Sequence, residues 1–106
     1  MFEFLKPKKT YENVSATDFR KLISENPDAI ILDVRTPAEF SQGAIKGAVN
    51  MDIMEADFGT KVAKLDKSKT YLVYCRSGNR SGSACSSMRT EGFDKVYNLA
   101  GGLMNY

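Results

Sequence analysis

The sequence predicts an α/β fold, with a doubly wound, mainly parallel sheet of five strands and helices on both faces. Two observations favour this fold class. Short runs rich in apolar and β-branched residues alternate with segments whose apolar residues recur at helical spacing, and the connections between them are short. One run, residues 29–34, is apolar at nearly every position, which is typical of a strand covered on both faces. At 106 residues, the chain has the length of one domain.

The N-terminal part of this domain predicts a strand followed by a helix. Residues 11–14 form the expected short strand. Ser15 has the features of a helix N-cap, since Asp18 supplies an acidic residue three positions later. Asn26-Pro27 is expected to end this helix, whose apolar residues follow helical spacing at Phe19, Leu22 and Ile23.

Shorter elements are expected in the middle of the chain. Pro37 predicts the first turn of a short helix over residues 36–40, and residues 48–51 predict a short strand. Residues 54–64 predict a further helix, in which Gly59 is the unfavourable residue. The apolar positions of this helix are Met54, Phe58, Val62 and Leu65.

The C-terminal part predicts a strand, a helix and a final strand. Residues 70–74 are rich in β-forming residues, a helix is expected over residues 81–91, and Gly92 ends it. Residues 95–99 predict the last strand before Gly101-Gly102. In folds of this kind ligands bind outside the carboxyl ends of the strands. We therefore expect the functional site directly after residues 70–74.

Cys75 occupies that position and is the candidate nucleophile. Gly78 and Asn79 tolerate tight backbone conformations, so the loop can turn successive N–H groups inward as an anion-binding nest. The following helix adds unpaired N–H groups and the positive end of its dipole. Arg76 and Arg80 are expected to fork onto a tetrahedral oxyanion. The candidate site comprises Cys75, Arg76, Ser77, Gly78, Asn79, Arg80 and Ser81.

A thiol in such a loop is expected to have a lowered pKa. An ordinary cysteine pKa of about 8.5 leaves only a few per cent as thiolate at neutral pH, and a helix N-terminus with an arginine favours the thiolate. The chain contains no histidine, so backbone dipoles and arginines are expected to activate Cys75 in place of an imidazole. The second cysteine, Cys85, shares a predicted helix stripe with Ala84 and Met88, and we expect it to be a core residue.

Composition narrows the expected partners and location. The net charge of +2 is too small to indicate a nucleic acid partner, and residues 1–10 are interpreted as a solvated lead-in to a domain over residues 11–106. No segment is long and apolar enough to cross a bilayer, and the N-terminus lacks the order of a signal peptide. With two cysteines and no histidine, we expect no disulfide framework, no metal and no cofactor. A cytoplasmic protein is the resulting expectation.

The loop that begins at Cys75 resembles the active-site loop of rhodanese-family sulfurtransferases. Three further segments, residues 32–40, 43–50 and 96–102, are similar to other signatures of that family and occur in the same order. The resemblance covers about residues 14–106 and implies a rhodanese-like fold.

The resemblance also implies a mechanism. Cys75 would take a sulfane sulfur from a small anionic donor such as thiosulfate and pass it, from a persulfide, to a thiol or cyanide acceptor. The N–H groups of residues 76–81 would stabilise the persulfide, Arg76 and Arg80 would attract the donor, and a sulfur-relay protein is a further expected partner. The chain departs from the family pattern at Ala44, where histidine is common. It also departs at its end, where Tyr106 replaces a common tryptophan and many relatives continue into another helix.

Several residues near the expected site have two interpretations. Asp33 and Arg35 lie at the end of a strand. A structural ion pair is the favoured interpretation, and a role in positioning the Cys75 loop is the alternative. Glu39 is expected to be a helix-surface carboxylate and Tyr74 a residue that packs on the sheet.

Two other function classes remain open. A cysteine phosphatase or arsenate reductase would use a cysteine loop on a tetrahedral oxyanion. Phosphatases, however, place one more residue between cysteine and arginine than the four that separate Cys75 from Arg80, so the shorter loop favours sulfur over phosphate. A non-catalytic binding module with the same fold is the third possibility. Such modules usually lack the cysteine, which is present here with both arginines.

Overall fold

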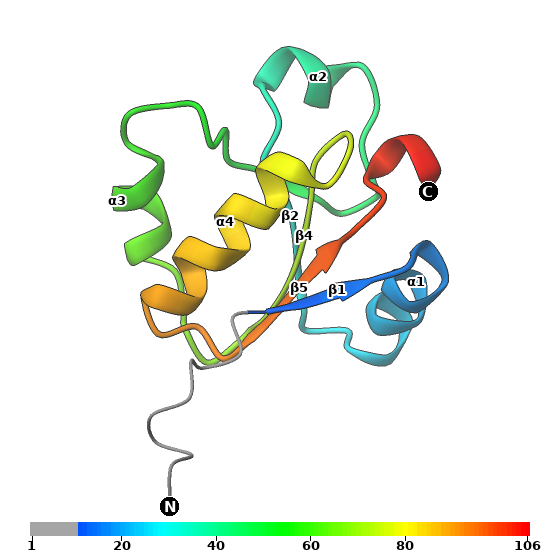
Figure 1. Cartoon of the computed structure of the whole chain (residues 1–106), viewed down its shortest axis with the longest axis horizontal. Coiled ribbons are helices and arrows are strands. Elements are labelled where there is room, and N and C mark those ends of the chain that lie inside the picture. Colours follow the sequence, from blue (N-terminus) through cyan, green and yellow to red (C-terminus); the bar gives the residue numbers. More distant parts are fainter. Residues whose placement is uncertain (1–10) are drawn as a thin grey trace, which may run out of the picture.

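The computed structural model describes residues 11–106 as a five-stranded sheet with helices on both faces (Figure 1). The strand order is β1-β5-β4-β2-β3, and each of these pairs is parallel. This confirms the predicted fold class; the expected lead-in, residues 1–10, lies outside the described residues. The strands are β1 Glu12–Val14, β2 Ile30–Asp33, β3 Val49–Asn50, β4 Thr70–Tyr74 and β5 Lys95–Leu99. The helices are α1 Ala16–Glu25, α2 Pro37–Ser41, α3 Phe58–Ala63 and α4 Asn79–Thr90, with a short 3-10 helix η2 at Leu103–Asn105.

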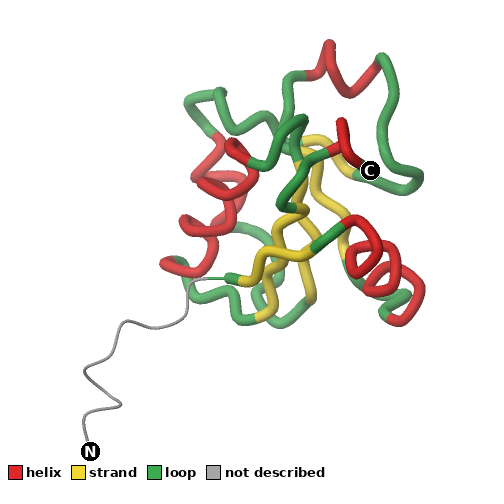
Figure 2. Tube along the Cα trace, turned by 45° about the vertical axis from the view of Figure 1, so that its right-hand side comes forward, coloured by secondary structure: helices red, strands yellow, loops and turns green. Residues whose placement is uncertain are grey.

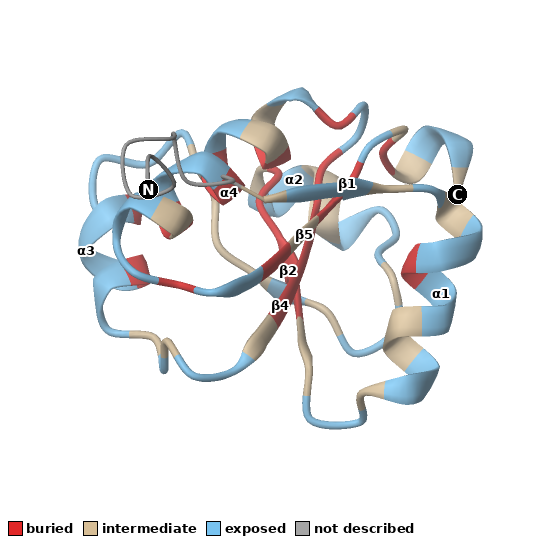
Figure 3. Cartoon of the chain, turned by 60° about the horizontal axis from the view of Figure 1, so that its bottom comes forward, coloured by how far each residue is buried: buried red, intermediate tan, exposed pale blue. Residues whose placement is uncertain are grey.

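The central strand β4 separates two hydrophobic layers, and the helices lie on either side of the strands in Figure 2. Successive side chains of a strand face opposite sides of the sheet. Tyr71 and Val73 pack with α3 and α4, whereas Leu72 and Tyr74 pack with α1. Cys75 continues the first set and belongs to the α4 layer. Buried residues concentrate on the central strands (Figure 3).

Side-chain caps fix the start of two helices. Ser15 Oγ accepts a hydrogen bond from Asp18 N at 3.1 Å, as the sequence predicts for α1. Helix α2 begins with a capping box, in which Thr36 Oγ1 accepts from Glu39 N at 3.2 Å and Glu39 Oε1 accepts from Thr36 N at 3.1 Å. The capping box holds the Glu39 carboxylate in place at the start of α2. No helix in the described part of the chain is long and apolar enough to span a membrane.

Two helices differ from their predicted bounds. Helix α3 starts at Phe58 and not at residue 54, because the Asp52 carboxylate accepts a hydrogen bond from Met54 N at 2.9 Å and the chain turns there. The Met54 side chain is consequently 72% exposed. Helix α4 starts at Asn79 and not at residue 81, because Gly78, with φ at 101°, takes the N-cap position. The first two residues of α4 therefore come from the predicted loop.

Candidate active site

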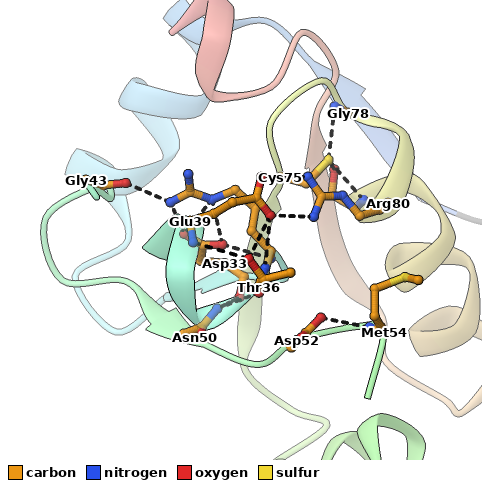
Figure 4. A network of polar contacts seen from close by, with 12 residues as sticks. Asp33, Thr36, Glu39, Gly43, Asn50, Asp52, Met54, Cys75, Gly78 and Arg80 are labelled. Carbon is orange, nitrogen blue, oxygen red and sulfur yellow. Dashed lines mark hydrogen bonds and ion pairs between the residues drawn. The ribbon is translucent and has the colours of Figure 1, made fainter. Parts of the chain in front are cut away.

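The Cys75 sulfur lies within a set of hydrogen-bond donors at the carboxyl end of β4 (Figure 4). Gly78 N lies 3.1 Å from Sγ, Ser81 N 3.4 Å and Ser81 Oγ 3.3 Å. Cys75 itself is fully buried. The loop from β4 to α4 thus surrounds the sulfur with N–H and O–H groups, which is the nest that the sequence predicts.

The pKa of Cys75 depends on two opposing effects. Burial raises the pKa of the thiol, because it disfavours the charged form. Hydrogen bonds from the Ser81 hydroxyl and from the N–H groups of Ser81, Gly78 and Ser77 lower it, and the net result is a pKa below the ordinary value. This is the direction that the sequence predicts, and it is reached without an imidazole.

The second cysteine has no such donors to lower its pKa. Cys85 is fully buried in the α4 layer, and burial raises the pKa of its thiol well above the ordinary value. Both cysteines are free thiols. The prediction that Cys85 is a core residue is confirmed. Within residues 11–106, no group of three or more His, Cys, Asp or Glu side chains is arranged to hold a metal ion.

The C-terminal turn supports the loop from one side. Leu103 N donates to the Cys75 carbonyl at 2.9 Å, and Met104 N donates to the Arg76 carbonyl at 3.1 Å. Gly102 has φ at 70°, and a Cβ added there would lie 2.0 Å from the Arg76 carbonyl oxygen. The site therefore requires glycine at this position, a role that was not predicted from the sequence. The only signal for it was the glycine pair that follows the last strand.

Strand β5 supports the loop from behind. Asn98 Nδ2 donates to the Gly78 carbonyl at 3.3 Å and to Asn13 Oδ1 at 2.8 Å. A Cβ added at Gly78 would lie 2.0 Å from the Ala100 carbonyl oxygen. Asn98 was also missed from the sequence, because an asparagine within a strand gives no sign of which loop it contacts.

Arg80 is paired with Glu39 and does not extend freely into the site (Figure 4). Arg80 Nη1 donates to Glu39 Oε1 at 2.7 Å and Nη2 to Oε2 at 3.0 Å, so the pair joins α4 to α2. The hydrogen bond from Arg80, helped by Thr36, lowers the pKa of Glu39 to about 2. Glu39 is a partly exposed carboxylate of α2, as predicted, and the capping box aims its side chain at α4, a contact that the sequence does not predict. A fork from Nη1 and Nη2 of Arg80 onto a donor oxyanion would therefore compete with Glu39.

Asp33 and Arg35 form a buried ion pair. Arg35 Nε lies 3.0 Å from both Asp33 oxygens, and Arg35 Nη2 lies 2.6 Å from Oδ2 and 2.8 Å from the Gly43 carbonyl. The Arg35 guanidinium also packs 5.6 Å from the centre of the Tyr74 ring, on the α1 side of the sheet. This geometry supports the interpretation of Asp33 and Arg35 as a structural ion pair. In the described residues, no hydrogen bond or ion pair links either side chain to the Cys75 loop.

A cleft of about 520 Å³ opens beside the loop, between α2 and η2. Arg76 lines it and is exposed, whereas Asn79 lines a separate cleft together with Asn98. Cys75 is not among the lining residues, in keeping with its burial. A donor in this cleft would therefore meet the Arg76 side chain before the sulfur. The cleft is lined by Arg35, Glu39, Gln42, Gly43, Ala44, Arg76, Leu103 and Met104.

Comparison with known proteins agrees with this fold. The family model for the rhodanese-like domain matches residues 15–106. A sulfurtransferase of Allochromatium vinosum is 30% identical over 91 residues, which cover 86% of this chain and 83% of that protein. A tRNA uridine(34) hydroxylase of Cytophaga hutchinsonii is 34% identical over 93% of this chain but only 32% of the hydroxylase. The crystal structure of a rhodanese-related protein from Thermoplasma volcanium, 31% identical, superposes with a TM-score of 0.76 over 89% of this chain and 88% of that one. The chain belongs to the rhodanese-like family.

Proposed function

We propose that this protein is a sulfurtransferase that moves sulfane sulfur from a donor such as thiosulfate to a thiophilic acceptor through a persulfide on Cys75. The observation that carries the proposal is the set of donors around Sγ, with Gly78 N at 3.1 Å and the N–H and O–H of Ser81 at 3.4 and 3.3 Å. These groups stabilise the negative charge of a thiolate on Sγ, and the same loop would offer its N–H groups to the outer sulfur of a persulfide. Membership of a family whose relatives include named sulfurtransferases supports the same reaction.

The reaction divides into two displacements. The Cys75 thiolate attacks the outer sulfur of thiosulfate, the S–S bond breaks, and sulfite leaves with the electron pair. The acceptor, cyanide or a thiol, then attacks the outer sulfur of the persulfide, and the thiolate of Cys75 is restored. No external oxidant or reductant is needed. Arg76, exposed in the cleft, attracts the anionic donor. In a reducing cytoplasm the acceptor would be a thiol, on a small molecule or on a sulfur-relay protein.

The proposal is tested by giving the purified protein thiosulfate and cyanide. We expect thiocyanate to form, and we expect Cys75→Ser to abolish it. After thiosulfate alone, the intact mass should increase by one sulfur atom in the wild type and not in Cys75→Ser. Cys85→Ala is the matched control, and it should still acquire the sulfur. If Cys75 acquires no sulfur from thiosulfate, polysulfide or an organic persulfide, the proposal is wrong and a non-catalytic binding module is favoured.

The phosphatase alternative predicts a different product. The loop between Cys75 and Arg80 is one residue shorter than a phosphatase requires, and Glu39 holds Arg80 in the structure. We therefore expect no Cys75-dependent hydrolysis of an aryl phosphate, and detection of such hydrolysis would contradict the spacing argument. The similarity to the tRNA hydroxylase covers 32% of that protein and supports a shared domain rather than a shared reaction.

A further inference from the structure

Glu39 uses the hydrogen-bond donors of Arg80 that would otherwise face an anion. Both outer nitrogens of Arg80 bind the two oxygens of Glu39, at 2.7 and 3.0 Å, in the forked geometry that guanidinium also uses for oxyanions. Thr36 N and Oγ1 hold Oε1 of the same carboxylate at 3.1 and 3.2 Å. Because the pKa of Glu39 is about 2, this side chain is ionised at every physiological pH. Glu39 therefore takes the Nη1–Nη2 edge of Arg80 and neutralises its charge, so a donor gains little from this edge unless it displaces a carboxylate that is already well held.

The other charges near the loop leave one guanidinium unpaired. Arg35 is bound by Asp33, and Arg80 is bound by Glu39. Asp52 adds a second carboxylate that interacts with Arg80 at longer range. Within the described part of the chain, Arg76 forms no ion pair. The positive charge offered to a ligand in the cleft is therefore that of a single guanidinium, which suits one carboxylate better than a compact dianion.

The walls of the cleft favour an organic ligand. Its volume of about 520 Å³ lies in the range of sites that bind organic molecules, and thiosulfate would occupy only a small part of it. Ala44, Leu103 and Met104 provide apolar surface, and the Met104 side chain is 61% exposed. Covering such surface is favourable for a ligand with carbon atoms and contributes nothing for a small inorganic anion.

We propose that Glu39 determines donor specificity, by holding Arg80 away from small dianions, and that the preferred donor is an organic persulfide, R–S–SH, whose R group carries a carboxylate for Arg76 and packs against Met104. This inference rests on the sulfurtransferase function proposed for Cys75. The Cys75 thiolate attacks the outer sulfur, the S–S bond breaks, and the electron pair leaves with R–S⁻. The outer sulfur and its proton remain on Cys75. Glu39 touches no reacting atom and is a positioning residue.

The test measures how fast the intact mass of the protein gains one sulfur atom, as a function of donor concentration, with glutathione persulfide and with thiosulfate. For the wild type, we expect half-maximal loading at a lower concentration of glutathione persulfide than of thiosulfate. Glu39→Gln keeps the capping box, since glutamine accepts the same bonds from Thr36, but it frees Arg80. This variant should lower the half-saturating concentration of thiosulfate roughly tenfold, as expected for a gained contact to a charged donor, and lower that of glutathione persulfide by a clearly smaller factor, because Arg76 already binds a carboxylate of that donor.

Two further variants sharpen the test. Met104→Ser should raise the half-saturating concentration of glutathione persulfide roughly fivefold and leave that of thiosulfate unchanged, because only the organic donor covers this side chain. Glu55→Gln, which removes another ion-paired glutamate, is the matched control and should change neither. A wild type that prefers thiosulfate, or a Glu39→Gln variant with unchanged thiosulfate saturation, would overturn the inference while leaving the function of Cys75 intact. If neither donor loads Cys75, the proposed function fails as well.

Discussion

Burial and hydrogen bonding have opposite effects on the pKa of the Cys75 thiol, and the hydrogen bonds from the loop have the larger effect. Cys75 and Cys85 are both fully buried and belong to the same hydrophobic layer. Burial, with a smaller contribution from the nearby charge of Cys75, raises the pKa of Cys85, whereas the donors of Ser81 and Gly78 bring the pKa of Cys75 below its ordinary value. The difference in pKa between the two thiols therefore comes from the hydrogen bonds and not from exposure.

Replacement of Ser81 by alanine should make Cys75 less reactive. Ser81→Ala removes a hydroxyl that lies 3.3 Å from Sγ, so the pKa of Cys75 should rise and less thiolate is present at neutral pH. We expect alkylation by iodoacetamide at pH 7 to slow roughly tenfold, the effect of one hydrogen bond to a charged group. The pH–rate profile should move to higher pH. Ser83→Ala, an exposed position of the same helix, should leave the profile in place, and an unmoved profile in Ser81→Ala would contradict the role of its hydroxyl.

At the scale of the elements, the Cys75 loop is held from both sides by segments distant in the sequence. The Glu39–Arg80 pair joins α2 to the first turn of α4. On the other side, the turn at Gly102 and η2 donates hydrogen bonds to the carbonyls of Cys75 and Arg76. The loop can keep its N–H groups aimed at the sulfur because these two contacts fix it before any substrate arrives.

The contact at Gly102 can be tested against another glycine that has a positive φ. Gly102→Ala would place a Cβ 2.0 Å from the Arg76 carbonyl oxygen, whereas a Cβ added at Gly47, where φ is 85°, would have no atom within 4 Å. Gly47→Ala should cost only the backbone strain of a left-handed residue, about 1 kcal/mol. Gly102→Ala should cost about 3 kcal/mol and should also slow sulfur loading of Cys75. Urea unfolding and intact-mass loading measure both effects, and equal losses in the two variants would argue against a steric role for Gly102.

The pair between α2 and α4 should contribute to stability in a pH-dependent way. The pKa of Glu39 in the folded protein, about 2, lies below the unfolded value of about 4.3, so the ionised carboxylate stabilises the fold above pH ~4.3. This contribution is lost as the pH falls from ~4.3 to about 2. Because the pair is partly exposed, we expect Glu39→Gln to reduce the free energy of unfolding by about 1 kcal/mol at pH 7. Denaturant unfolding across this pH range should show that the difference in the free energy of unfolding between variant and wild type disappears as the pH falls. If the difference persists at pH 2, the loss of stability in Glu39→Gln does not come from the ionised carboxylate.

For the whole molecule, the elements that lie in regular hydrophobic patterns could be predicted, and the contacts between distant segments could not. The apolar run at residues 29–34 and the β-rich run at residues 70–74 placed β2 and β4 within one residue of their ends, and with them the position of Cys75. The start of α4 was misplaced by two residues, because Gly78, with φ at 101°, takes the N-cap position. The partner of Arg80 was missed because Glu39 lies 41 residues away, and only the packing of α2 brings the two together.

The position of Cys75 at the end of β4 connects the site to the most protected part of the sheet. Strand β4 pairs with β2 on one side and β5 on the other, and Tyr71 to Tyr74 have no exposed surface. Strands β1 and β3 lie at the two edges of the sheet and, among the described residues, pair on one side only.

Amide protons that exchange only on global unfolding should therefore be concentrated in β4. In a native-state hydrogen exchange measurement, we expect β4 to approach the global free energy of unfolding, with β1 and β3 exchanging by local opening at lower cost. Equal protection of β1 and β4 would show that the loop is anchored to a sheet that opens as a single unit.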